Sequence, residues 1–273
     1  MTKFLLGKPV ADSIYREIDE KTTEPCLALV RAGEDPSSLS YEKMLTKKAE
    51  EHGIKVVKHN FSEDVNEMEF LVELQKIGMD EGVNGILVLQ PLPKQIHKKA
   101  LVKIMPPAKD IDCITGFNAA KIYSNEDVQF VPATAQSVLE ILDFYEIDVA
   151  GKNVVIVGRS DVVGKPLALM LLHRNATVTV AHSHTQNLCD LTKRADVVVL
   201  ATGRAYAYGR TFFSAGQTII DVGTSVDEDG NLMGDVDFSE VEPFVDAITP
   251  VPKGVGSVTT SVLLRAVCRA AEN

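Results

Sequence analysis

The sequence has 273 residues, of which 45% are hydrophobic and 24% are charged, and its formal net charge is -10. A chain of this length and composition can bury a full core, and we expect two domains. The negative charge argues against nucleic acid or an anionic membrane as the main partner, because both favour a basic surface. The four cysteines have neither paired nor metal-ligand spacing, and no apolar run is long enough to cross a bilayer. We therefore expect a cytoplasmic protein.

Helical and strand patterns alternate along the first half of the chain. The predicted elements are a helix over 9–21, a strand over 25–30, a polar loop over 31–39, a helix over 41–53, a strand over 54–61, a helix over 66–79 and a strand over 85–89. Strands that alternate with helices predict parallel sheets joined by right-handed crossovers, and hence an α/β fold.

The second half continues the alternation after a long helix over 133–145. The predicted elements are strands over 154–157, 176–180, 196–201 and 218–222, a helix that begins near Gly164, and a terminal helix over 260–271. We place one domain at 1–133, completed by 257–273, and the other at 134–256. No repeat or low-complexity segment interrupts either part.

The segment from Val154 to Pro166, VVIVGRSDVVGKP, is the most informative in the chain. Its first four residues are apolar, as in a parallel strand covered on both faces. The strand breaks at Gly158, a short polar loop leads to Gly164, and Pro166 lies in the first turn of a helix, where proline is well tolerated. A strand, glycine turn and helix N-terminus direct free backbone N–H groups toward a phosphate. The segment predicts a dinucleotide site, although its glycine spacing differs from G-x-G-x-x-G.

The end of the next strand indicates which dinucleotide is preferred. In NAD enzymes an Asp or Glu about twenty residues after the first glycine binds the ribose 2′-hydroxyl. Here the strand ends in Ala181, His182, Ser183 and His184, and Arg159 stands in the glycine loop. These donors and this cation suit a 2′-phosphate, so NADP is favoured over NAD. His182 and His184 lack a third ligand, and no metal site is predicted.

Two further loops are candidates for chemistry, because sites in such folds lie at the carboxyl ends of strands. Lys109-Asp110-Ile111-Asp112 places two carboxylates after a proline pair. Residues 248–257 form a proline- and glycine-rich loop before the last helix. Residue type alone leaves a solvated turn as the simpler interpretation of each loop.

The motifs of both halves, taken together, resemble those of the methylenetetrahydrofolate dehydrogenase/cyclohydrolase family. The resemblance is collinear and covers essentially the whole chain. The segments that carry it are Tyr41 at the start of a lysine-rich helix, Pro91-Leu92-Pro93, Lys109 to Asp112, GRSDVVGKPLALMLL at 158–172, ATVTVAHSHT at 176–185, Asp221 to Gly223, Gly234 to Val236, and TPVPKGVGSVT at 249–259.

The resemblance implies a Rossmann-like NADP-binding domain at 134–256 and an α/β folate-binding catalytic domain at 1–133, completed by 257–273. It implies NADP-linked oxidation of 5,10-methylenetetrahydrofolate to 5,10-methenyltetrahydrofolate, which typical bifunctional members then hydrolyse to 10-formyltetrahydrofolate. The implied assembly is a homodimer formed through the cofactor domains. The implied partner is a small folate, with no nucleic acid and no membrane.

The resemblance also assigns site residues. The implied catalytic residues are Tyr41, Lys47, Gln90 and Asp110. The implied substrate contacts are Tyr41, Leu92, Asp110, Pro250, Val251, Gly254 and Gly256. The implied cofactor contacts are Gly158, Arg159, Ser160, Gly164, Lys165, Pro166, His182, Ser183, Thr202, Gly203, Val222, Gly223 and Thr224. Within K-D-x-D, Asp110 would pair with the pterin, and Asp112 would hold the loop.

The chain departs from the family pattern at two positions that handle protons. The family usually has a Lys four residues after the Tyr, on the same helix face, where this chain has Leu45. It usually has Gln followed by an apolar residue before Pro-Leu-Pro, whereas this chain has Leu89 followed by Gln90. Lys47 or Lys48 replaces the missing lysine, and Gln90 the missing amide, only if the local backbone is shifted, and Tyr41 with water is another route for the proton. Further on, Lys253 and Ser257 stand where the family usually has Gly and Pro.

These departures bear mainly on hydrolysis. Hydride transfer requires alignment of donor and acceptor, whereas attack of water on the methenyl bridge requires proton removal. We therefore expect the dehydrogenase reaction and leave the cyclohydrolase reaction open. A catalytically silent folate- or dinucleotide-binding relative and an NADP dehydrogenase of another small substrate remain alternatives.

Overall fold

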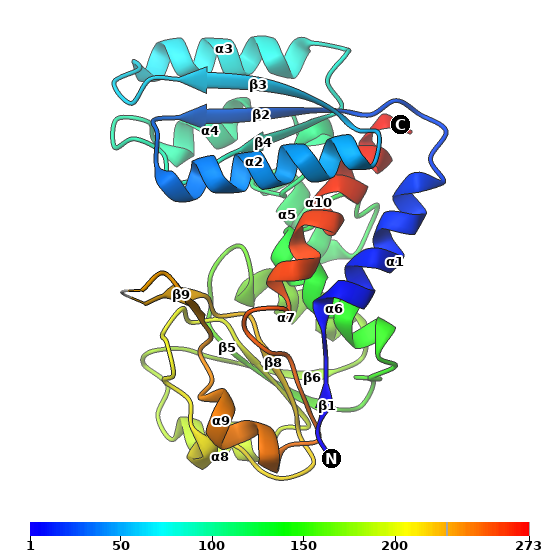
Figure 1. The fold of residues 1–273 in the computed structure, drawn as a ribbon, viewed down its shortest axis with the longest axis vertical. Coiled ribbons are helices and arrows are strands. Elements are labelled where there is room, and N and C mark those ends of the chain that lie inside the picture. Colours follow the sequence, from blue (N-terminus) through cyan, green and yellow to red (C-terminus); the bar gives the residue numbers. More distant parts are fainter. Residues whose placement is uncertain (228, 273) are drawn as a thin grey trace. The chain divides into compact units, whose positions relative to one another are not determined.

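A computed structural model describes residues 1–227 and 229–272 (Figure 1). These residues form two compact units. Residues 1–12 and 132–259 make up the first, which we call the large-sheet unit, and residues 13–131 together with 260–272 make up the second, the small-sheet unit. Each unit has its own sheet and its own core, as the predicted two-domain α/β class requires.

The large-sheet unit is built on a parallel sheet of six described strands in the order β1-β11-β8-β7-β5-β6. Their bounds are β1 Lys3–Phe4, β5 Asn153–Val157, β6 Thr177–Ala181, β7 Val197–Leu200, β8 Thr218–Asp221 and β11 Ala247–Ile248. β5 and β7 are buried along nearly their whole length, which fits their continuous apolar sequences and the helices that follow each strand. β6 is an edge strand and is mostly exposed.

Helices and a short hairpin complete the large-sheet unit. They are α6 Ala133–Phe144, α7 Gly164–His173, α8 Leu188–Lys193, α9 Phe238–Val241, and the antiparallel pair β9 Ser225–Val226 and β10 Leu232–Met233. The chain passes between the units within α1 Gly7–Asp19 and near the start of α10 Gly256–Ala271. Among the described residues, no helix combines the length and apolar character needed to cross a membrane.

The small-sheet unit is a parallel sheet of three described strands in the order β3-β2-β4. The bounds are β2 Cys26–Ala32, β3 Lys55–Phe61, β4 Gly85–Val88, α2 Pro36–Glu51, α3 Glu67–Met79, α4 Lys98–Ile104 and α5 Gly116–Ser124. Phe70 and Leu74 of α3 and Leu101 of α4 pack with strand residues in one buried cluster. β2 is buried at every position because it lies between the other two strands.

The structure differs from the sequence prediction at the N-terminus. Lys3 and Phe4 pair in parallel with Ala247 and Ile248, so β1 extends the large sheet. Residues 1–12, 132–133 and 257–259, which the sequence prediction assigns to the first domain, therefore belong to the large-sheet unit. A two-residue strand has too short a pattern to be predicted without its partner.

Candidate active site

The glycine turn between β5 and α7 is as tight as the sequence predicted. Gly158 has a φ of 134°, and a Cβ there would lie 2.4 Å from the carbonyl oxygen of Ala201. A Cβ on Gly164 would lie 2.1 Å from the carbonyl oxygen of Gly158. Only glycine fits at either position. Because neither glycine has a side chain, a phosphate can approach the N-terminus of α7 closely.

A cavity of about 390 Å³ lies at the carboxyl ends of β5, β6 and β7. Its lining includes five of the predicted cofactor residues, namely Gly158, Arg159, His182, Ser183 and Thr202. Sequence reasoning missed Thr185, Leu188, Arg204 and Tyr208, which also line it. Arg204 could have been found, because it follows the strand end of β7, where ligands bind in such folds.

The lining suits NADP. Among the described residues that line the cavity, the charged side chains are those of Arg159 and Arg204. The N–H donors of a guanidinium group match the oxygens of a phosphate well. The glycine turn has no room for a Cβ at Gly158 or Gly164. Together with this turn, the two arginines fit a dinucleotide that carries a 2′-phosphate.

Other predicted cofactor residues have structural partners instead. Ser160 Oγ accepts a hydrogen bond from the backbone N–H of Val163 at 3.1 Å and so shapes the loop. Lys165 Nζ pairs with Asp161 at 2.6 Å, and Pro166 is buried in the first turn of α7. None of the three is among the residues that line the cavity, and their roles as cofactor contacts stay a prediction. Gly203 precedes Arg204 and is exposed.

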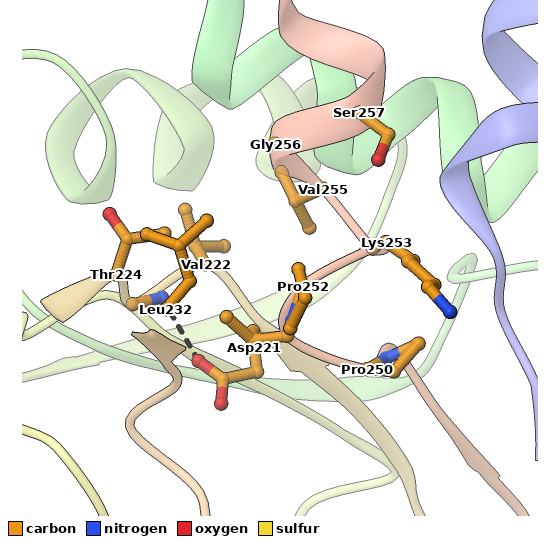
Figure 2. A pocket seen from close by; sticks show the side chains of 13 residues that line it. Asp221, Val222, Thr224, Leu232, Pro250, Pro252, Lys253, Val255, Gly256 and Ser257 are labelled. Atoms are coloured by element: carbon orange, nitrogen blue, oxygen red, sulfur yellow. Dashed lines mark hydrogen bonds between the residues drawn. The ribbon is translucent and has the colours of Figure 1, made fainter. Parts of the chain in front are cut away.

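A second cavity, of about 240 Å³, lies beside the end of β8 (Figure 2). The predicted residues Val222, Gly223 and Thr224 line it, and so do Pro250, Val251, Gly254 and Gly256. A Cβ on Gly254 would lie 2.4 Å from the carbonyl oxygen of Pro250, so this loop turns too tightly for another residue. Lys253 in the same loop has a φ of 86°, a conformation that is unfavourable for lysine.

Two buried carboxylates support this wall. Asp221 accepts backbone N–H groups from Gly223 at 2.9 Å, Asp235 at 3.1 Å and Val236 at 2.9 Å. Asp235 in turn accepts the N–H of Thr202 at 2.6 Å and that of Arg204 at 2.7 Å. Burial raises the pKa of Asp221 to about 7, against the opposing effect of its three N–H donors. The sequence motifs around Asp221 and Asp235 give no sign of this bracing role, which depends on contacts between the two loops.

The small-sheet unit presents Tyr41 from α2. Burial, and after it the negative charge of Asp112, raises the pKa of Tyr41. The hydroxyl is therefore protonated at neutral pH. Leu45, one turn further along α2, is fully buried, and Leu89 at the end of β4 is 4% exposed.

A buried ion pair anchors the helix that carries Tyr41. Glu42 is 6% exposed and accepts from Arg31 Nε at 2.8 Å, while Lys58 Nζ lies 3.3 Å from its other oxygen. Asp35 caps the start of α2 by accepting the backbone N–H of Ser37 at 3.1 Å and that of Ser38 at 3.0 Å. These contacts tie α2 to β2 and β3 and fix where Tyr41 stands.

Within Lys109-Asp110-Ile111-Asp112, Asp110 makes the loop-holding contacts that the sequence analysis expected of Asp112. Asp110 is 1% exposed, and its oxygens accept from the N–H of Ile114 at 2.8 Å, the N–H and Oγ1 of Thr115 at 2.9 and 2.6 Å, and Asn118 Nδ2 at 2.9 Å. These donors come from its own loop and α5, so Asp110 holds the loop. The negative charge of Asp112, in contrast, contributes to the raised pKa of Tyr41.

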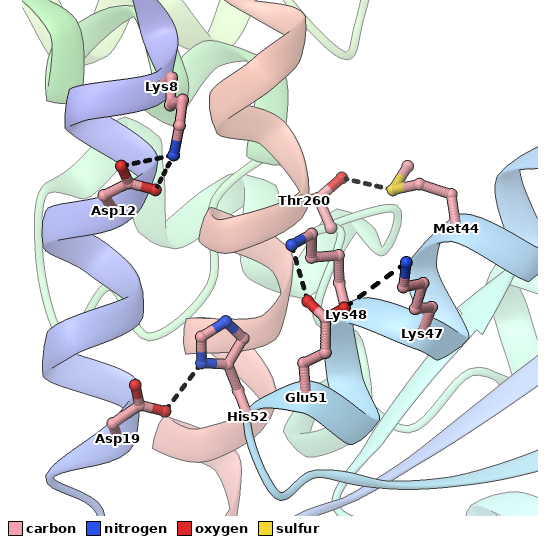
Figure 3. Close-up of polar contacts among 9 residues, drawn as sticks. All are labelled: Lys8, Asp12, Asp19, Met44, Lys47, Lys48, Glu51, His52 and Thr260. Carbon is pink, nitrogen blue, oxygen red and sulfur yellow. Dashed lines mark hydrogen bonds and ion pairs between the residues drawn. The ribbon is translucent and has the colours of Figure 1, made fainter.

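The predicted substitutes for the missing lysine and glutamine, Lys47 and Gln90, are both exposed. Lys47 is 76% exposed and pairs with Glu51 at 3.8 Å, and Lys48 pairs with the same carboxylate at 2.7 Å (Figure 3). Gln90 is exposed, and its backbone carbonyl accepts from Ser38 Oγ at 2.6 Å. These contacts do not support the predicted catalytic roles of Lys47 and Gln90. Leu92, a predicted substrate contact, packs against the hydrophobic cluster of this unit.

Comparison with known proteins agrees with these features along the whole chain. Residues 5–112 match the model of the tetrahydrofolate dehydrogenase/cyclohydrolase catalytic domain, and residues 132–273 match that of the NAD(P)-binding domain of the same family. A bifunctional protein FolD of Clostridium botulinum (strain Kyoto / Type A2) is 42% identical over 279 residues, which cover 100% of this chain and 99% of the relative.

Solved structures agree as well. Bifunctional FolD of Campylobacter jejuni superposes with a TM-score of 0.97 at 36% identity, over 100% of this chain and 99% of that one. The Trypanosoma brucei enzyme, complexed with NADP cofactor and inhibitor, superposes with a TM-score of 0.93 at 30% identity, over 99% and 97% of the two chains. The predicted family and fold class are confirmed, and the chain belongs to the tetrahydrofolate dehydrogenase/cyclohydrolase family.

Proposed function

We propose that this protein oxidises 5,10-methylenetetrahydrofolate to 5,10-methenyltetrahydrofolate with NADP, and that hydrolysis of the methenyl product is the weaker of its two reactions. The observation that carries the proposal is the cavity lined by Arg159, Arg204, His182 and Ser183 beside the glycine turn. The Campylobacter jejuni relative is named a methylenetetrahydrofolate dehydrogenase/cyclohydrolase, which supports the choice of substrate.

The residues of the large-sheet unit would bind and orient the cofactor. The arginines and Ser183 would hold the 2′-phosphate, and the open backbone at Gly158 and Gly164 would admit the pyrophosphate. NADP, when bound, supplies the hydride acceptor. The tightly turned loop over 250–256 would lie along the reacting rings and exclude water from them.

The residues of the small-sheet unit would bind the folate. The Asp112 carboxylate can accept charge-assisted hydrogen bonds from the amino and ring N–H groups of a pterin. Tyr41, which lies within the electrostatic reach of Asp112, would pack its ring against the substrate and offer its hydroxyl. Asp110 supports this arrangement by holding the loop that carries Asp112 in place.

The balance between the two reactions follows from Leu45 and Leu89. In the oxidation, the methylene carbon loses a hydride, and its bridge between two nitrogens becomes the methenyl cation, so no side chain needs to remove a proton. In the hydrolysis, a water molecule must lose a proton as it attacks that cation. Leu45 and Leu89 are buried hydrocarbons and cannot accept it. We therefore expect slow hydrolysis.

A steady-state assay tests the proposed oxidation. Purified protein is mixed with methylenetetrahydrofolate and NADP, and NADPH formation is followed by absorbance. We expect saturable kinetics with both reactants. Absence of NADPH formation by a folded protein that binds NADP would refute the proposed function.

We also propose a homodimer, formed through the large-sheet units. β6 is paired on one side with β5, and its other edge has no strand partner among the described residues. Val180 of this strand is 36% exposed. An unpaired edge of this kind favours pairing with another chain. Light scattering of the natural protein and of Val180→Lys would test it, since the charged variant should shift toward monomer.

The four free cysteines support a cytoplasmic location, where thiols stay reduced.

A further inference from the structure

The cavity at the ends of β5, β6 and β7 has a charged rim and an apolar inner part. Arg159, Ser183 and Arg204 line it and are exposed. The apolar part of the lining is buried or half-buried and consists of Val157, Leu188, Ala201 and the ring of Tyr208. A phosphate suits the exposed arginines, whereas a flat, largely apolar group suits the inner part.

Tyr208 in the inner part carries a hydroxyl that the protein does not use. The residue is 5% exposed, and no described residue forms a hydrogen bond with its hydroxyl. In the described part of the chain, the side-chain atoms that are sealed from solvent without a partner are Thr23 Oγ1 and Thr46 Oγ1. The Tyr208 hydroxyl is not one of them, so it keeps some accessible surface, and the side chain lines the cavity. A buried phenol usually has a hydrogen-bond partner, and this one is available to a ligand.

The threonine hydroxyls of the same lining already serve the protein. Thr202 Oγ1 donates to Asp235 Oδ2 at 2.8 Å. Thr185 Oγ1 accepts the backbone N–H of His182 at 2.9 Å. Tyr208 therefore differs from both, because its hydroxyl is buried in the lining and unpaired among the described residues.

The surrounding structure holds Tyr208 in place. Its backbone N–H donates to the carbonyl of Asp235 at 3.1 Å, and its own carbonyl accepts the N–H of Asp237 at 3.0 Å. Its ring meets that of Phe212 edge-on, with the centroids 5.1 Å apart, and packs in the buried cluster that includes Leu200. A side chain fixed in this way loses little freedom when a ligand binds to it.

We propose that Tyr208 is a cofactor-binding residue whose hydroxyl forms a hydrogen bond with the amino-bearing edge of the adenine ring of NADP. Adenine has apolar faces and an edge with an amino donor and ring-nitrogen acceptors, and a phenol can pair with either. With the 2′-phosphate at the exposed arginines, the edge opposite the ribose enters deepest, where Tyr208 is buried. The inference rests on the proposed function, because it takes this cavity as the NADP site, and it goes further in placing the adenine and naming its partner.

The test removes the hydroxyl alone. Tyr208→Phe keeps the ring and its contact with Phe212, and calorimetry measures the dissociation constants of NADP and NAD. Both should rise about 3- to 10-fold and by the same factor, because the two cofactors share the adenine. The unfolding temperature should not change, since no described residue depends on the hydroxyl. Unchanged dissociation constants would overturn the proposal, and so would a rise for NADP alone, which would place the hydroxyl at the 2′-phosphate.

Tyr206→Phe is the matched control. Tyr206 stands two residues earlier, is 55% exposed and is not among the residues that line the cavity. Its loss of a hydroxyl should leave both dissociation constants unchanged.

An analogue of NADP with an etheno bridge across N1 and N6 of the adenine tests the placement of the edge. The blocked edge cannot pair with a phenol, so the natural protein and Tyr208→Phe should bind this analogue equally weakly. An affinity that is still lower in Tyr208→Phe would contradict the proposal, because the hydroxyl would then serve another part of the cofactor.

These measurements need no folate and no turnover, so they separate the inference from the proposed oxidation. A protein that binds NADP with this pattern but forms no NADPH would refute the oxidation and leave the role of Tyr208 intact. A protein that forms NADPH but binds both cofactors equally well with and without the hydroxyl would refute the role of Tyr208 alone.

Discussion

Asp221 and Asp235 brace each other's loops: the carboxylate of Asp221 accepts the backbone N–H of Asp235 at 3.1 Å, and both side chains are buried. A Cβ on Gly234 would lie 2.2 Å from an oxygen of Asp221, and one on Gly223 would lie 2.1 Å from an oxygen of Asp235. The glycine beside each aspartate therefore makes room for the other carboxylate. This pair joins the walls of the two cavities, because Asp221 lines one and Asp235 holds Thr202 and Arg204 of the other.

The raised pKa of Asp221 predicts a pH dependence of stability. Its pKa is about 7 in the folded protein and about 4 in an unfolded chain. Between these values the folded state binds more protons, so this residue's contribution to the free energy of unfolding falls as pH rises from 4 to 7. The loss is at most about 4 kcal/mol. Asp221→Asn should flatten this part of the profile in urea unfolding, and equal slopes in both proteins would contradict the assignment.

Cofactor choice depends on Arg159. Arg159→Ala should raise the KM for NADP by about 10- to 100-fold and that for NAD far less, as expected for one charged hydrogen bond to phosphate. Arg174→Ala is the control, because Arg174 pairs with Asp143 at the other end of α7 and should not affect either cofactor. An equal loss with both cofactors would remove Arg159 from the 2′-phosphate site.

The two aspartates at 110 and 112 can be separated by one substitution each. Asp112→Asn should weaken folate binding by one to two orders of magnitude while the unfolding temperature stays constant. Asp110→Asn should instead destabilise the fold by about 1–3 kcal/mol, because an amide cannot accept from all four of its donors. Thermal unfolding and folate KM are measured for both. The reverse pattern would restore the assignment made from sequence.

Hydrolysis should be gained by restoring the family's usual pair. Leu45→Lys with Leu89→Gln places an amine and an amide on the faces that helix and strand geometry give them, and general acid–base assistance is worth about 10²–10⁴ in rate. Lys47→Met is the control, since Lys47 pairs with Glu51 in solvent and should have no effect on hydrolysis. If Lys47→Met abolishes rapid hydrolysis in the natural protein, the position assigned to Lys47 is wrong.

Much of the fold could be predicted from the sequence, because long periodic segments carry their own signal. β5 and α7 appear where the apolar run, Gly158 and Pro166 place them. α2, however, begins at Pro36 and not at Tyr41. Asp35 as the cap and Pro36 in the first turn were visible signals for that start, but the polar residues after them resemble a loop.

The site was harder to predict, since residue type does not reveal which way a side chain faces. Asp110 and Asp112 are chemically identical and two residues apart, and only the donors around Asp110 show that it holds the loop. The hydrogen bond from Thr260 to Met44 had no sequence signal, because the two residues lie 216 positions apart. Lys47 had the right chemistry, but it lies on an exposed part of α2 beside Glu51.

A single reaction tests the proposed balance of activities most directly. The natural protein is mixed with methylenetetrahydrofolate and NADP, and NADPH and the methenyl product are followed together by absorbance. We expect both to form in parallel, with the methenyl product then disappearing at close to its uncatalysed rate. NADPH formation accompanied by rapid loss of the methenyl product would contradict the inference from Leu45 and Leu89, and no NADPH at all would contradict the proposed oxidation.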